Sequence, residues 1–258
     1  MFEKFSVFMS AFKQDRTIRV YLPSNYFNEK KRYPVLYMHD GQNVFRDEES
    51  IRGVSLRVGD YLDETGLEII VVGIDLNTTD QERVNEYCPW VNGEFSKKLL
   101  GQACSSGGKG EAYLDFVVNE LKPLIDQKYR TLENDTSMAG ISLGGLISTY
   151  AACRYPLIFS KVAVLSPAFY RNQEEIEKLI RNSDLSAIER YYMDCGTKEA
   201  GQEEEISEIF LGTNQAVNEI LREKVPNLKF AILDDFVHDY SDFKKRIPEV
   251  LSFLYSDK

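Results

Sequence analysis

Short apolar runs alternate with helix-like segments along most of this chain. The runs are continuous and bounded by Gly, Pro, Asp or Asn, as is typical of strands covered on both faces. They occupy Thr17–Leu22, Tyr33–His39, Glu68–Asp75, Ser137–Ile141, Lys161–Leu165, Arg190–Asp194 and Leu228–Leu233. Near the amino terminus, Phe5, Val7, Met9 and Ala11 alternate with the residues between them, which predicts one more strand.

Between the runs, apolar residues recur with the period of an amphipathic helix. These helical segments are Gly110–Lys128, Gly144–Arg154, Gln202–Glu223 and Ser241–Tyr255. The alternation predicts an α/β fold: a mostly parallel central sheet, helices on both faces and an antiparallel amino-terminal hairpin. Ligands of such sheets bind at the carboxyl ends of the strands, so we expect the chemistry there.

One segment, residues 77–110, breaks the alternation. It is long, polar and rich in Gly and Ser, and it contains Tyr87, Trp90 and Phe95. Because structureless segments of this length are uncommon and usually functional, we expect a lid-like insertion or a substrate wall. No repeat or linker marks a boundary elsewhere, which predicts a single domain over residues 1–258.

Composition narrows the class of protein. The 258 residues are 43% hydrophobic and include 31 basic and 41 acidic side chains, a formal net charge of −10. This balance argues against nucleic-acid and anionic-membrane partners. No apolar run approaches the roughly 20 residues of a membrane span, and Glu3 and Ser6 interrupt what could resemble a secretion signal.

The cysteines are scattered, at Cys88, Cys104, Cys153 and Cys195. Their spacing indicates neither a zinc site nor a disulfide framework. We therefore expect reduced thiols in a cytoplasmic protein. A calcium-loop-like spacing from Asp75 to Glu86 has Asp80 where the turn needs Gly, so we expect no metal there.

A Gly-x-Ser-x-Gly motif, Gly140 to Gly144, follows the run Ser137–Ile141 and precedes a helical segment. That strand–turn–helix setting is the one a nucleophile elbow requires, because the sharp turn lifts the hydroxyl of Ser142 clear of the sheet. The alternative is a tight connection in which Ser142 only caps the helix. The free N–H of Leu143 at the helix amino terminus is the natural first oxyanion donor.

A serine nucleophile needs a base and an acid, which follow it in the chain order Ser, acid, His. His39 precedes Ser142, so His238, in the loop after the last predicted strand, is the candidate base. For the acid we favour Glu199, beyond a Gly-Thr turn, over Asp194 at the strand tip.

The loop after the strand Tyr33–Met38 should supply the second oxyanion donor. Gly41 lets the backbone approach a ligand, so the N–H of Gln42 is the candidate. His39 and Asp40 are expected to pin this loop through their side chains.

Several motifs carry a resemblance to a known family. They are Y-x-M-H-D-G-Q-N-x-F, E-Y-x-P-W, G-E-x-Y-x-D-F-x-x-N-E-L-K-P-x-I-D-x-x-Y-R-T, A-G-I-S-L-G-G-L, S-P-A-F and D-C-G-T-K-E. From Tyr33 to about Phe243, the chain resembles the serine esterase family of the α/β-hydrolase superfamily. That family includes enterobactin, feruloyl and acetylxylan esterases, S-formylglutathione hydrolases and mycolyltransferases.

The resemblance implies an α/β-hydrolase fold and names the same site residues. It implies Ser142 as nucleophile, His238 as base, Glu199 as third member, and the backbone N–H groups of Gln42 and Leu143 as oxyanion hole. Some members have Asp after the Gly-Thr turn, where this chain has Glu, so Asp194 stays open as the acid.

We therefore expect hydrolysis of a small-molecule carboxylic ester through an acyl-enzyme, without a cofactor. The alternatives are acyl transfer to an alcohol acceptor and a non-catalytic binding protein on a hydrolase scaffold. Tyr87, Trp90 and Phe169 are candidates for contacting the substrate, or else pack within the protein. The identity of the ester and the oligomeric state are left open.

Overall fold

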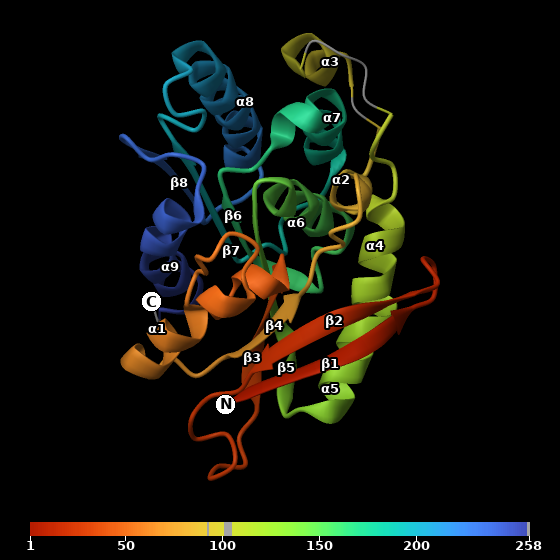
Figure 1. The fold of residues 1–258 in the computed structure, drawn as a ribbon, viewed down its shortest axis with the longest axis vertical. Helices are drawn as coiled ribbons and strands as arrows, with labels where there is room; N and C mark the ends of the chain where they lie inside the picture. The colour runs from red at the N-terminus through yellow and green to blue at the C-terminus, as the bar shows by residue number, and fades with distance from the viewer. Residues whose placement is uncertain (92, 101–104, 257–258) are drawn as a thin grey trace.

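A single mixed sheet forms the centre of the protein (Figure 1). The computed structural model describes residues 1–91, 93–100 and 105–256. The strands lie in the order β1-β2-β4-β3-β5-β6-β7-β8. Their bounds are Phe2–Met9 (β1), Gln14–Tyr21 (β2), Tyr33–His39 (β3), Ile70–Ile74 (β4), Thr131–Ile141 (β5), Phe159–Leu165 (β6), Arg190–Gly196 (β7) and Leu228–Leu233 (β8).

The pairing confirms the predicted architecture. Strands β1 and β2 form an antiparallel hairpin, and β2 pairs antiparallel with β4. All further neighbours, from β4 through β3 to β8, are parallel. The carboxyl ends of the parallel strands therefore lie at one edge of the sheet, where the predicted site residues follow them.

Helices cover both faces of the sheet. The bounds of the helices are Val58–Thr65 (α1), Glu82–Tyr87 (α2), Glu94–Leu100 (α3), Gly110–Phe116 (α4), Lys122–Lys128 (α5), Leu143–Arg154 (α6), Gln173–Asn182 (α7), Glu204–Arg222 (α8) and Tyr240–Tyr255 (α9). A π-helical turn, Val117–Leu121, joins α4 to α5, so the predicted helix Gly110–Lys128 is one continuous helical segment. No helix within the described ranges is long and apolar enough to cross a bilayer.

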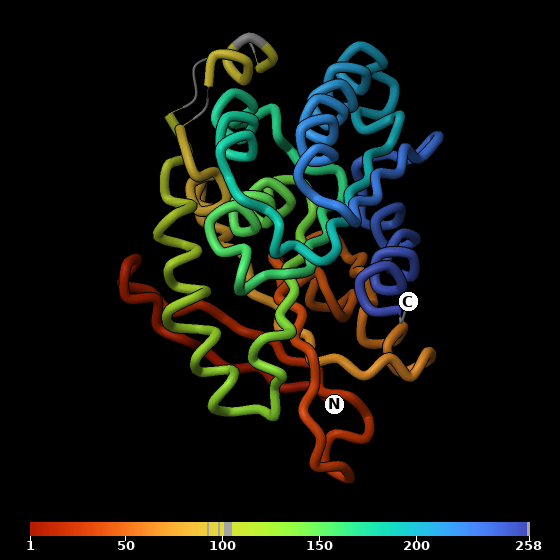
Figure 2. Tube along the Cα trace, turned by 180° about the vertical axis from the view of Figure 1, so that it is seen from behind, coloured from red at the N-terminus to blue at the C-terminus, as the bar shows by residue number. Residues whose placement is uncertain are grey.

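Strand β3 shows how the two apolar layers arise. Val35 and Tyr37 join the cluster that packs under α4 to α8, whereas Leu36 and Met38 join the one under α1 and α9. Successive strand residues point to opposite faces, so a continuous apolar run fills both layers. Figure 2 shows the α4–α5 segment and α6 in front of the strands when the molecule is seen from behind.

The segment 77–110 differs from the structureless insertion that we expected. It contains the short helices α2 and α3. Buried contacts hold α2 against the rest of the protein: Glu86 forms an ion pair with Arg16 on β2 at 2.7 Å, and Tyr87 lies in the apolar core. Cys104, among the predicted reduced thiols, lies outside the described residues; Cys153 and Cys195 are buried.

Candidate active site

Ser142 occupies a strained turn between β5 and α6. Its φ of 59° and ψ of −118° lie where an L-residue is rarely found, and such strain persists only where the surroundings enforce it. A side chain at Gly140 would overlap the backbone of Gly144, and one at Gly145 would lie 2.7 Å from Cβ of Pro167. The glycines therefore permit the close strand–helix packing that the motif predicted.

His238 and Glu199 form a short carboxylate–imidazole contact. His238 Nδ1 lies 2.6 Å from Glu199 Oε2. Because an ionised carboxylate only accepts hydrogen bonds, Nδ1 is the donor in this contact, and in the neutral imidazole the lone pair then lies on Nε2. The imidazole stands edge-on between the rings of Phe210 and Phe243, at centroid distances of 5.6 and 5.1 Å.

Glu199 is buried but held in its ionised form. Its Oε1 accepts hydrogen bonds from Ser166 Oγ at 2.5 Å and from the Gly196 N–H at 2.6 Å. Burial raises the pKa of Glu199, but the hydrogen bonds from His238, Ser166 and Gly196 outweigh it, so this pKa lies below the ordinary range. An ionised Glu199 can orient the imidazole and stabilise its protonated form.

Asp194, the alternative acid, contacts a different partner. It is fully buried and pairs with Arg246 at 2.9 Å. Burial raises the pKa of Asp194 to about 6, against the opposing effect of Arg246. Arg246 Nη1 also donates to Ser166 Oγ at 2.7 Å, which links this ion pair to Glu199. Asp194 therefore anchors Arg246 behind the Glu199–His238 contact, and no hydrogen bond or ion pair of the described residues joins it to the imidazole.

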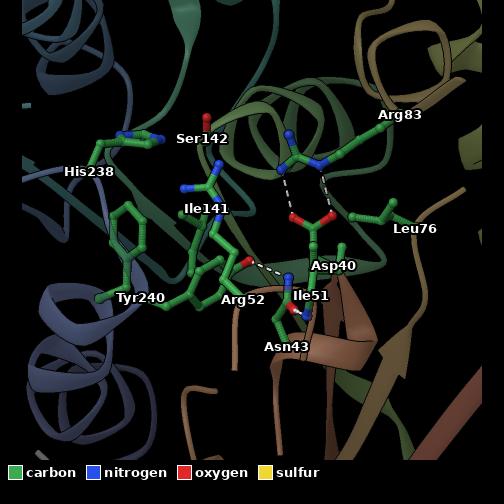
Figure 3. Close-up of a pocket in the computed structure, with 11 residues that line it drawn as sticks. Asp40, Asn43, Ile51, Arg52, Leu76, Arg83, Ile141, Ser142, His238 and Tyr240 are labelled. Atoms are coloured by element: carbon green, nitrogen blue, oxygen red, sulfur yellow. Dashed lines mark hydrogen bonds and ion pairs between the residues drawn. The ribbon is translucent and has the colours of Figure 1, made fainter. Parts of the chain in front are cut away.

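Ser142 and His238 border the same cavity of about 210 Å³ (Figure 3). The cavity is lined by Asp40, Asn43, Ile51, Arg52, Leu76, Arg83, Ile141, Ser142, His238, Tyr240 and Phe243. Among the described residues, no hydrogen bond joins Ser142 to His238. Catalytic hydrogen bonds are often long or poorly aligned without substrate, so the lack of this bond does not argue against proton transfer between the two side chains.

The loop after β3 lies against the amino terminus of α6. A Cβ on Gly144 would lie 3.3 Å from Cβ of His39, so the two backbones approach closely. A 3₁₀ turn, Gly41–Asn43, follows, and Gly41 packs against Gly73 so tightly that a Cβ would lie 2.6 Å from its carbonyl carbon. Gln42 Oε1 accepts a hydrogen bond from Leu76 N–H at 3.1 Å, which fixes this turn beside the cavity.

His39 and Asp40 pin this loop, as the sequence led us to expect. His39 Nδ1 and the Tyr113 hydroxyl are hydrogen-bonded at 2.8 Å. Asp40 N–H donates to the Tyr87 hydroxyl at 3.2 Å, and its carboxylate accepts two hydrogen bonds from Arg83, at 2.9 and 2.7 Å. Burial lowers the pKa of His39 to about 4, so this imidazole is neutral at neutral pH.

The three aromatic residues singled out for substrate contact lie outside the cavity lining. Tyr87 and Phe169 are fully buried in the apolar core. Trp90 packs edge-on against Tyr150 at a centroid distance of 5.3 Å. These three side chains therefore make packing contacts in the fold, and their contact with a substrate stays a prediction.

Sequence reasoning missed several residues that line the cavity. Asn43, Ile51, Arg52, Arg83 and Tyr240 all lie on loops or near helix ends beyond the strands. In the sequence, these residues are marked only by their position after a predicted strand or near His238. That position does not indicate which side chains point into the cavity.

Two acidic residues of the calcium-loop-like segment, Asp75 and Glu86, form ion pairs. Asp75 Oδ1 lies 2.7 Å from Arg19 Nε, and Glu86 is paired with Arg16. Two of the acidic residues in that spacing therefore have cationic partners within the fold.

Comparison with known proteins identifies the family. The family described as "Putative esterase" matches residues 9–254, almost the whole chain. The chain belongs to this esterase family. It is accordingly a hydrolase that acts on esters, with the α/β-hydrolase fold.

The relatives are consistent with this membership. The uncharacterized protein YbbA of Bacillus subtilis (strain 168) is 28% identical over 247 residues, 93% of each chain. A solved ferulic acid esterase superposes with a TM-score of 0.71 at 20% identity, covering 98% of this chain and 97% of that one. The enterobactin esterase FES from Shigella flexneri superposes with a TM-score of 0.74 at 16% identity, covering 98% and 59%.

Proposed function

We propose that this esterase hydrolyses a small carboxylic ester by a serine mechanism with an acyl-enzyme intermediate. The observation that carries the proposal is the His238–Glu199 contact of 2.6 Å at the cavity that Ser142 also lines. A binding protein would not need a buried ionised carboxylate behind an imidazole that faces a strained serine. These features support nucleophilic catalysis over passive binding.

In the first step, His238 Nε2 takes the proton of the Ser142 hydroxyl as Oγ attacks the ester carbonyl. Glu199 stabilises the imidazolium that forms. The tetrahedral intermediate collapses when His238 returns the proton to the leaving alcohol oxygen. Water, deprotonated by His238, then attacks the acyl carbon. The second tetrahedral intermediate collapses as His238 returns the proton to Ser142 Oγ, which releases the acid and the free serine.

The oxyanion of each tetrahedral intermediate needs hydrogen-bond donors. Leu143 N–H stands in the first turn of α6, where helix N–H groups have no intrahelical acceptor. We assign it and Gln42 N–H, on the turn that packs beside α6, to the oxyanion hole. Loss of one such donor typically costs ~10²–10³ in turnover.

The test compares Ser142→Ala with Ser183→Ala on p-nitrophenyl acetate. Ser183 follows α7 away from the cavity and serves as the matched control. We expect Ser142→Ala to lose at least ~10³-fold in kcat, because the nucleophile is gone, with Ser183→Ala unchanged. Unchanged hydrolysis by correctly folded Ser142→Ala would overturn the proposal.

A further inference from the structure

Arg52 brings a cationic side chain to the cavity, and this side chain has no hydrogen-bond or ion-pair partner among the described residues. It lines the cavity and is exposed to solvent, and Figure 3 shows its side chain extending toward Ser142 and His238. Arg52 forms no hydrogen bond or ion pair with any residue that the structure describes. A guanidinium is always charged at neutral pH, so this group offers unused donors to whatever enters the cavity.

The charged side chains nearest to the cavity have ion-pair partners. Within the cavity, Arg83 is paired with Asp40 at 2.7 Å. Behind the cavity, the carboxylate of Glu199 contacts the imidazole of His238. Two of the three acidic side chains that directly precede Arg52 in the chain are also paired: Asp47 with Arg57 at 2.6 Å and Glu49 with Arg19 at 2.5 Å, while Glu48 is exposed. Arg52 is thus the cavity-lining charge left uncompensated among the described residues.

The backbone around Arg52 is tied to the site. Ile51 N–H donates to Asn43 Oδ1 at 2.9 Å, and Asn43 Nδ2 donates to the Tyr240 hydroxyl at 2.8 Å. Asn43 belongs to the turn that holds Gln42, and Tyr240 begins the helix just after His238. The position of Arg52 is therefore coupled to both the candidate oxyanion loop and the base.

We propose that Arg52 is a specificity-determining residue that binds a carboxylate on the ester substrate. The proposal rests on the proposed function. A guanidinium fork matches a carboxylate with two parallel charge-assisted hydrogen bonds. Apolar walls from Ile51, Leu76 and Ile141 and a volume of about 210 Å³ suit a small ester with one anionic end. One free guanidinium compensates one negative charge, while the net charge of −10 disfavours polyanions.

The test uses two pairs of esters that differ in charge but share a chromophore or leaving group. Mono-4-nitrophenyl succinate is compared with 4-nitrophenyl butyrate, and 4-acetoxybenzoate with its methyl ester. We expect the wild type to prefer the carboxylate in at least one pair. In Arg52→Gln, kcat/KM for that anionic ester should fall ~10- to 100-fold, mainly through KM, because a charge-assisted hydrogen bond is lost. The neutral ester should change less than about 3-fold.

Two variants complete the design. Arg52→Lys keeps the charge but not the fork, so it should retain part of the preference. Arg222→Gln, an exposed arginine in the last turn of α8, removes the same charge far from the cavity and should leave the preference intact. An equal loss in Arg222→Gln would assign the effect to overall charge and overturn the role of Arg52.

The two proposals fail in different ways. A wild type without carboxylate preference, or an Arg52→Gln variant with unchanged preference, overturns the Arg52 proposal even if hydrolysis depends on Ser142. Hydrolysis that persists in Ser142→Ala overturns the proposed function instead.

If neither pair of esters is hydrolysed, calorimetry measures the binding of monoethyl succinate and of benzoate to Ser142→Ala. Binding that is lost when Arg52→Gln is added supports the carboxylate site. No binding to Ser142→Ala overturns it. Tighter binding of phenyl phosphate than of benzoate would reassign the site to phosphate and also overturn it.

Discussion

Glu199 and Asp194 are two buried carboxylates of one network in different environments. Glu199 accepts hydrogen bonds from His238, Ser166 and Gly196, which lower its pKa against the effect of burial. Asp194 faces Arg246, and burial raises its pKa to about 6. The first carboxylate is therefore suited to support an imidazolium, and the second to anchor an arginine.

Substitution by the neutral amide separates these roles. We expect Glu199→Gln to lower kcat by ~10²–10⁴, because the imidazole loses its orienting charge. Asp194→Asn should change kcat less than ~10-fold but lower the free energy of unfolding by about 3 kcal/mol, since Arg246 is left buried without its counter-charge. Kinetics on p-nitrophenyl acetate and urea unfolding measure the two effects. A folded Asp194→Asn protein as impaired in turnover as Glu199→Gln would move the acid to Asp194.

Residue patterns predicted part of this network. The order of Ser142, Glu199 and His238 along the chain was sufficient to propose them, and Glu199 does contact His238. Nothing in the sequence ties Arg246 to Asp194 and Ser166, because they lie on three elements that meet only when the sheet is assembled. The same holds for Tyr113, which reaches His39 from α4.

The strand–turn–helix element around Ser142 depends on glycine for steric reasons. Gly140 leaves room for the backbone of Gly144, and Gly145 leaves room for Pro167. The motif and its flanking apolar run predicted this element well, because one local pattern encodes strand, turn and helix. Helices α1 and α7 were missed, because they are only 8 and 10 residues long and each buries only three residues.

Alanine at two glycines tests the element. Gly140→Ala should lower the free energy of unfolding by at least about 2 kcal/mol and abolish turnover, because its methyl overlaps the Gly144 backbone. Gly212 is exposed within α8, and a methyl group there would point into open space, so Gly212→Ala should stabilise by about 0.5–1 kcal/mol. Denaturant unfolding checks both. Equal stabilities of the two variants would refute the steric account.

At the scale of the whole molecule, the period of apolar residues predicted the layered α/β architecture but not the interior of the cavity. The strands and the main helices follow from which faces must be buried. Which loop side chains point into the cavity depends on contacts between distant segments, such as Asn43 with Tyr240. Arg52 and Arg83 therefore emerged only from the assembled structure.

The buried neutral His39 makes stability fall in acid. In the unfolded chain an imidazole takes up a proton near pH 6.5, whereas in the fold burial lowers the pKa of His39 to about 4. The unfolded state thus binds more protons in this window, and lowering the pH from 7.5 to 5.5 should cost about 1 kcal/mol of unfolding free energy.

His39→Gln should remove that contribution. Asp194, whose pKa is raised to about 6, acts in the opposite direction, but it is present in both proteins. The difference between wild type and His39→Gln therefore isolates the imidazole. Urea unfolding at the two pH values measures it, and an equal pH dependence in both proteins would show that His39 is not buried in its neutral form.

The central claim, that Ser142 is the nucleophile, is tested most directly by covalent labelling. The protein is treated with a fluorophosphonate, and the adduct is located by intact-mass and peptide mass spectrometry. We predict one adduct per chain on Ser142, formed at a rate that falls at least ~10²-fold in Glu199→Gln, because activation depends on His238 and its carboxylate. An active protein that remains unlabelled, or is labelled at another residue, would contradict the account.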